Sequence, residues 1–177
     1  REAIENLLSD AEDRRPVILC EYAYQILNSG GGLKYFRALT ERYPRFQGGF
    51  IWDFQDKALW QEDENGKHYA GYGGDFFESV IEPFEPKFMC LNGIVTHDLS
   101  VKPAGLEAAA VYAPVFVENR KNGKYILKNR YVSLSTAGMT LYWTTYQAGD
   151  PPGTGEMPLP VIDAMTETEI SFGPNGM

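Results

Sequence analysis

Two short apolar runs, each ending in polar or charged residues, constrain the fold of this sequence most. The first covers residues 16–20 and the second residues 47–54. The first run is continuous and rich in β-branched side chains, which is typical of a strand buried on both faces of a parallel sheet. Between the two runs, residues 33–43 carry apolar side chains at helical spacing, and Pro44 ends that segment. With a further helix predicted over residues 2–9, the order of elements predicts a right-handed βαβ unit with parallel strands.

The chain changes character after residue 58. Residues 76–105 contain several prolines and no regular apolar spacing, which predicts an irregular connection. We therefore place a domain boundary at residues 103–105. This gives a first, α/β domain over residues 1–103 and a second, all-β domain over residues 104–177.

Short apolar runs separated by turns fill the second domain. We expect residues 130–136 to pair with residues 139–147 around Ala137-Gly138, and residues 150–155 to form a loop. The predicted strands cover residues 111–118, 124–129, 130–136, 139–147 and 167–172. Several short strands at this spacing predict an antiparallel β-sandwich.

The charge of the chain excludes two classes of partner. There are 24 acidic against 16 basic side chains, a formal net charge of −8 and a sequence pI of about 4.8. A general nucleic-acid-binding protein needs a basic face, and so does docking on anionic lipid. No apolar run approaches the length of a transmembrane helix. We therefore expect neither nucleic acid nor a membrane as a partner.

A carboxylate and an indole are predicted at one edge of the parallel strand pair. Glu21 follows the first strand and Trp52 lies at the end of the second. The carboxyl ends of adjacent parallel strands meet at one rim, where β/α-barrel active sites are built. Sugar hydrolysis needs both groups: a carboxylate for the charge that develops at the anomeric carbon, and a flat apolar face for the ring. The alternative is an ordinary solvated Glu21, a core Trp52 and a helix-capping Asp53.

Several segments resemble the glycoside hydrolase family 2 β-galactosidases of the bacterial lactose-operon type. The most specific are Glu21-Tyr-Ala-Tyr24 followed by Asn28-Ser-Gly, then Gly-Gly-Phe-Ile-Trp52-Asp, and then Cys-Leu-Asn92-Gly. Further matches cover residues 43–46, 63–66, 72–76, 130–131, 141–143 and 155–156. Their order and approximate spacing agree with the family over nearly the whole chain.

The resemblance implies roles for residues at the predicted rim. Glu21 would be the catalytic nucleophile at the end of barrel strand seven. Trp52, at the end of strand eight, would be the platform under a galactose ring. Tyr24 and Asn28 would bind the substrate from the loop after the nucleophile, although the family usually has His at the position of Tyr24.

The resemblance also implies metal ions. The side chain of Asn92 and the backbone carbonyl of Met89, where the family has Phe, would bind a sodium ion near the galactose 6-hydroxyl. The family also uses magnesium, whose ligands would lie upstream of residue 1. We therefore expect sodium and magnesium as cofactors of a longer parent enzyme.

The resemblance further implies that the chain is a fragment. It would comprise strands seven and eight of a (β/α)8 TIM barrel with their helices, followed by an immunoglobulin-like β-sandwich, either complete or without its last strand. The family's general acid/base would lie upstream, so we expect this segment of a retaining β-galactosidase to be inactive alone. The alternatives are a non-catalytic carbohydrate-binding module and a structural or assembly fragment. For the parent we expect a homo-oligomer in the cytoplasm, with the periplasm as the alternative compartment.

Overall fold

The computed structural model describes residues 2–25, 30–76, 90–120 and 124–173. The chain forms two compact units, Arg1–Tyr112 and Ala113–Met177. The division falls later than the predicted boundary at residue 103, because helix α4 (Pro103–Tyr112) packs in the core of the first unit. None of the helices within the described ranges is long and apolar enough to cross a bilayer.

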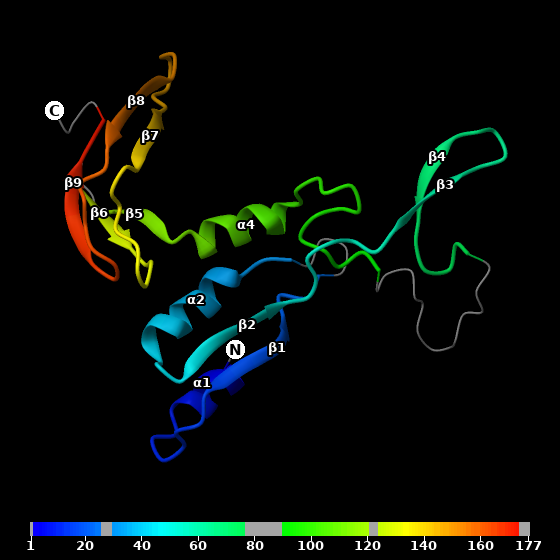
Figure 1. Ribbon diagram of the computed structural model, residues 1–177, viewed down its shortest axis with the longest axis horizontal. Coiled ribbons are helices and arrows are strands. Elements are labelled where there is room, and N and C mark those ends of the chain that lie inside the picture. Colours follow the sequence, from blue (N-terminus) through cyan, green and yellow to red (C-terminus); the bar gives the residue numbers. More distant parts are fainter. Residues whose placement is uncertain (1, 26–29, 77–89, 121–123, 174–177) are drawn as a thin grey trace. The chain divides into compact units, whose positions relative to one another are not determined.

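The first unit contains the predicted βαβ arrangement (Figure 1). Its elements are α1 (Glu2–Leu8), β1 (Val17–Tyr22), α2 (Leu33–Arg42), β2 (Phe46–Ile51), β3 (Leu59–Glu62), β4 (His68–Gly71) and α4. Strands β1 and β2 pair in parallel, with Val17 opposite Phe46 and Tyr22 opposite Ile51. The parallel pair predicted from the two apolar runs is therefore confirmed.

One face of the β1–β2 pair carries the core of the first unit. Leu8 of α1, Leu39 of α2 and Phe46 of β2 form one buried cluster. The strands approach closely at Gly49, where a Cβ atom would lie 2.8 Å from the Cβ of Leu19, so this position of β2 requires glycine.

A second buried cluster joins helix α4 to the same layer. Ala108 of α4 packs with Tyr22 of β1 and Leu33 of α2. This contact makes residues 103–112 part of the first unit. The expectation of a strand starting at residue 111 is wrong, since the strand β5 begins only at Val115.

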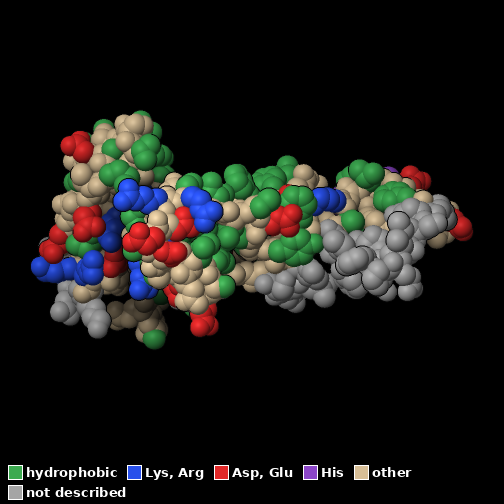
Figure 2. Space-filling view, turned by 90° about the horizontal axis from the view of Figure 1, so that it is seen from below, with side chains coloured by type: hydrophobic (Ala, Val, Ile, Leu, Met, Phe, Trp, Pro, Cys, Tyr) green, Lys and Arg blue, Asp and Glu red, His purple; other side chains and the backbone are tan. Residues whose placement is uncertain are grey.

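The other face of the strand pair is open within the described part of the chain. Ile18 and Phe50 keep 55% and 68% of their surface exposed, and Cys20 is also exposed. The expectation that the first strand is buried on both faces is therefore not met among these residues. Figure 2 shows apolar side chains reaching the surface between acidic and basic ones.

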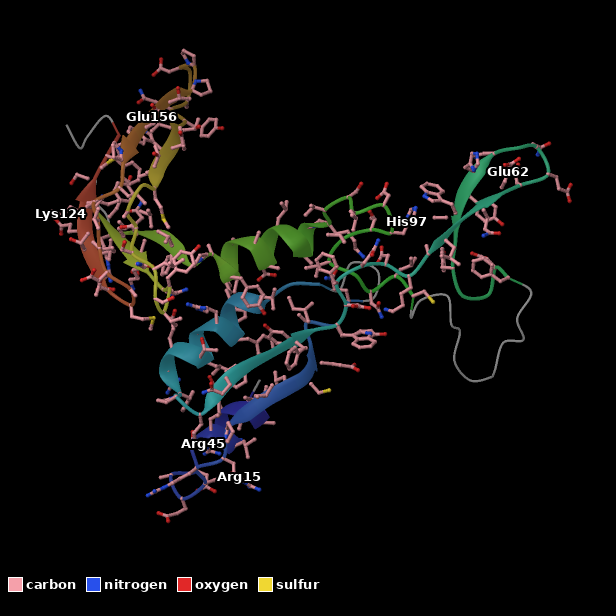
Figure 3. All side chains as sticks on the ribbon, in the orientation of Figure 1. Arg15, Arg45, Glu62, His97, Lys124 and Glu156 are labelled. Atoms are coloured by element: carbon pink, nitrogen blue, oxygen red, sulfur yellow. The ribbon has the colours of Figure 1, made fainter. Side chains whose placement is uncertain are left out.

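An arginine cluster ties together the two strands at their starts. Arg45, directly before β2, donates to the carbonyls of Arg15 at 3.0 Å and Asp10 at 2.8 Å. Its Nη2 also lies 3.0 Å from Oδ2 of Asp13, which Arg15 contacts as well (Figure 3). These contacts fix the end of the pair that is opposite the predicted catalytic rim.

The described residues of the second unit form two antiparallel sheets. The strands are β5 (Val115–Asn119), β6 (Lys124–Asn129), β7 (Thr140–Thr145), β8 (Gly153–Pro158) and β9 (Glu167–Ser171). The sheets have the orders β5-β6-β9 and β7-β8. Phe172 stacks on Tyr125 of β6 and also contacts Trp143 of β7, which links the two sheets. The all-β character agrees with the prediction, and the immunoglobulin-like arrangement stays a prediction.

One predicted strand pair in this unit is wrong. The strand β7 pairs with β8, over residues expected to include a loop, and not with residues 130–136. Side-chain hydrogen bonds hold residues 130–136 instead of a strand ladder. Thr136 donates to the carbonyl of Pro160 at 2.6 Å and accepts from the amide of Ile162 at 2.9 Å.

Candidate active site

Glu21 and Trp52 lie at the same end of the parallel strand pair. Glu21 is the next-to-last residue of β1, and Trp52 directly follows β2. The amide of Trp52 donates to the carbonyl of Tyr22 at 3.2 Å, which continues the strand pairing up to the rim. The peptide bond between Trp52 and Asp53 is cis.

The two side chains are both accessible at this rim. The carboxylate of Glu21 is exposed and accepts no hydrogen bond from any of the described residues. Trp52 keeps 39% of its surface exposed. An open carboxylate at this rim could act as a nucleophile toward a bound sugar, and an accessible indole at the same rim offers a flat apolar face to the sugar ring.

A second segment pairs with the chain just after β2. The amide of Asp53 donates to the carbonyl of Asn92 at 2.8 Å, and the amide of Ile94 donates back to the carbonyl of Asp53 at 2.9 Å. The amide of Lys57 donates to the carbonyl of Cys90 at 2.7 Å. These backbone bonds bring Asn92 to the rim from a distant part of the sequence.

A largely buried ion pair holds the segment around Asn92 in place. Asp56 accepts from Lys102 Nζ at 2.9 Å and 3.2 Å, and its Oδ1 accepts from the amide of Gly93 at 2.8 Å. The side chains of Asp56 and Lys102 are only 9% and 19% exposed. At Gly93, a Cβ atom would lie 2.3 Å from the amide nitrogen of Asp56. Only glycine permits this approach, so the position of Asn92 is set by its neighbour.

Asn92 is the centre of a polar network at the rim. Asn92 is only 1% exposed, and its Nδ2 donates to the hydroxyl of Tyr24 at 3.1 Å. Its Oδ1 accepts from Lys57 Nζ at 3.0 Å. The same ammonium is paired with the carboxylate of Asp53 and lies 5.1 Å from the centre of the Trp52 ring. A buried asparagine with both ends of its amide bonded is a fixed, oriented group.

The electrostatics of the network centre on Asp53. The hydrogen bond from Lys57 lowers the pKa of Asp53 below its ordinary value, and the amide of Phe54 adds to this effect. Asp53 therefore carries its negative charge at neutral pH and neutralises the ammonium beside Trp52.

The described residues do not fit the sodium ion that the resemblance implies. Asn92 Oδ1, the expected ligand atom, already accepts a hydrogen bond from an ammonium group. A sodium ion bound to the same oxygen would have to displace this ammonium group from Asn92. Among the described residues, no group of three or more His, Cys, Asp or Glu side chains is arranged to hold a metal.

The structure places four of the six predicted site residues. Glu21 and Trp52 share the rim, and Asn92 and Tyr24 are hydrogen-bonded to one another beside it. Asn28 and Met89 lie outside the described residues. Sequence reasoning missed Lys57, because residues 53–57 are not helical and the helical i,i+4 rule therefore does not indicate its pairing with Asp53.

A comparison with known protein families agrees with this geometry. The family model described as "Glycosyl hydrolases family 2, TIM barrel domain" matches residues 1–117. The match covers the whole of the first unit, including the rim and the segment that carries Asn92.

Proposed function

Since the chain belongs to glycosyl hydrolase family 2, we propose that it is the nucleophile-bearing segment of a retaining β-galactosidase that hydrolyses terminal β-D-galactosyl residues. One observation carries this proposal. The open carboxylate of Glu21 and the accessible ring of Trp52 lie at the same end of two paired parallel strands.

The proposed chemistry assigns a step to each described residue. Glu21 attacks the anomeric carbon of the sugar, the bond to the leaving oxygen breaks, and a covalent glycosyl-enzyme forms that water later hydrolyses. Trp52 supports the apolar face of the ring, and the hydroxyl of Tyr24, which accepts from Asn92 Nδ2, binds a hydroxyl of the sugar. No step is assigned to a metal ion.

The mechanism requires a second carboxyl group as general acid, about 5–5.5 Å from the nucleophile. We propose that this group comes from a part of the parent enzyme upstream of residue 1. The 177-residue chain alone then lacks protonation of the leaving oxygen, a step typically worth about 10²–10⁴-fold in rate. We therefore propose that it does not turn over galactosides by itself.

The proposal is tested by replacing and labelling the nucleophile in the parent enzyme. We expect Glu21→Gln to abolish hydrolysis of a nitrophenyl β-galactoside while leaving the circular dichroism spectrum unchanged, because the side-chain volume is kept and the charge is lost. An activated 2-fluoro galactoside should attach to Glu21, as read by peptide mass spectrometry.

Other outcomes of this experiment favour other functions. Labelling of Asp53 or Asp56 would contradict the assignment of the nucleophile. Binding of sugar without labelling or turnover in the parent would favour a non-catalytic carbohydrate-binding protein. Turnover by the purified 177-residue chain that vanishes in Glu21→Gln would contradict the proposed need for an upstream acid.

A further inference from the structure

Asn92 Oδ1, the oxygen expected to bind sodium, already accepts a hydrogen bond from the ammonium of Lys57. Lys57 Nζ donates to Asn92 Oδ1 at 3.0 Å and is paired with the carboxylate of Asp53. An ammonium held by an amide oxygen and a carboxylate oxygen has the charge and the kind of ligands of a bound monovalent cation.

The backbone holds this ammonium in place. The amide of Lys57 donates to the carbonyl of Cys90, and Asp53 is bonded through its own backbone to Asn92 and Ile94. The ammonium of Lys57 therefore lies between two partners, Asn92 and Asp53, whose backbones are held in place. The exposed fraction of this side chain is 47%, so the group is held at the surface of the site and is reachable by a ligand.

We propose that Lys57 is the built-in cation of this site: its ammonium takes the place of sodium at Asn92 and donates to a hydroxyl of the sugar bound on Trp52. An ammonium has three N–H donors, and the described residues accept two of them. The Nζ atom lies over the Trp52 ring, 5.1 Å from its centre, so a hydroxyl of a sugar bound at that ring is within its reach. This inference rests on the proposed function of Trp52 as a sugar platform.

Sugar affinity in different salts tests the inference. The parent protein carrying Glu21→Gln, so that the sugar is not consumed, is titrated with galactose by calorimetry in sodium chloride and in choline chloride of equal ionic strength. With Lys57 present, we expect the two dissociation constants to agree within about twofold. With Lys57→Gln added, affinity in choline should fall about tenfold, the loss of one charge-assisted hydrogen bond, and sodium should restore part of it.

Sodium binding is also read directly, without any sugar or activity. The line width of the ²³Na resonance should rise more on addition of the Lys57→Gln protein than on addition of the protein with Lys57. Lys67→Gln is the matched control, because it removes the same charge from an exposed lysine in the turn between β3 and β4. Lys57→Arg keeps the charge and should remain insensitive to sodium.

The results separate this inference from the proposed function. The inference would be overturned if the protein with Lys57 showed the same sodium-dependent sugar affinity as the Lys57→Gln protein. It would also be overturned if both proteins broadened the ²³Na resonance equally. If Lys57→Gln does not fold, the unsubstituted and Lys57→Arg proteins still decide it by the same two measurements. If no sugar binds in either salt, the proposed function fails, while the ²³Na comparison still shows whether Lys57 excludes sodium.

Discussion

The buried pair of Asp56 and Lys102 should dominate the stability of the segment that carries Asn92. Removing the ammonium by Lys102→Met leaves the carboxylate of Asp56 nearly enclosed, with the amide of Gly93 as its remaining hydrogen-bond donor among the described residues. At 2.9 Å and an effective dielectric of 20, the direct attraction is about 6 kcal/mol. Breaking a buried pair on one side costs about 3–5 kcal/mol, and the partial exposure of Lys102 places this case near 3 kcal/mol.

An exposed ion pair in the same chain provides the control. Lys124 and Glu169 lie 3.0 Å apart with 61% and 54% of their side chains exposed. Lys124→Met should therefore cost less than about 1 kcal/mol. Urea unfolding measures both variants.

Hydrogen exchange gives a local measurement of the same effect. The amide of Gly93 donates to Asp56, so its protection should fall strongly in Lys102→Met and stay unchanged in Lys124→Met. Adding Asp56→Asn to Lys102→Met should recover part of the stability, because the unpaired charge is gone. A loss below about 1 kcal/mol for Lys102→Met, or a double variant as unstable as the sum of the single ones, would refute this reasoning.

Two further predictions concern aromatic residues of the first unit. Trp52→Ala should weaken sugar binding more than it lowers stability. About three fifths of the surface of Trp52 is buried, so we expect the free energy of unfolding to fall by about 2–3 kcal/mol. An unchanged sugar affinity per folded molecule would show that Trp52 is only a core residue. Burial and the hydrogen bond with Tyr112 raise the pKa of Tyr22 above its ordinary value of 10.0. The folded protein then keeps a proton that the unfolded chain loses, so stability should fall as the pH rises above about 10, and the fall should be smaller in Tyr22→Phe when urea midpoints are compared.

The local sequence was sufficient to predict the parallel strand pair. Two apolar runs bounded by Pro16 and Pro44, with one helix between them, leave few alternatives, and the structure has this arrangement. Membership of glycosyl hydrolase family 2, suggested by the residues around Glu21, Trp52 and Asn92, is confirmed by the match over residues 1–117, and the β-galactosidase specificity stays a prediction. Both predictions rest on short sequence patterns, each of which can be recognised within its own segment.

The failures come from contacts between distant residues. Helix α4 belongs to the first unit because Ala108 packs on Tyr22 and Leu33, which no pattern within residues 103–112 indicates. The turn at Gly138 resembles a hairpin, but Thr136 bonds to the chain beyond β8 and so keeps the preceding residues out of the ladder. The contact between Lys57 and Asn92 spans 35 positions in the sequence, so it was also missed.

Two acid–lysine pairs act on the same asparagine segment, and their exposure separates their roles. Asp53 and Lys57 keep 28% and 47% of their side chains exposed, whereas Asp56 and Lys102 keep 9% and 19%. An exposed pair contributes little to stability and is reachable by a ligand, while a buried pair is costly to break and is shielded from salt. Both acids follow β2 within a few residues, and both lysines reach residues 91–92, Lys102 through the carbonyl of Leu91 at 3.4 Å. The inner pair therefore sets where Asn92 lies, and the outer pair is the one that a sugar bound on Trp52, as we propose, would meet.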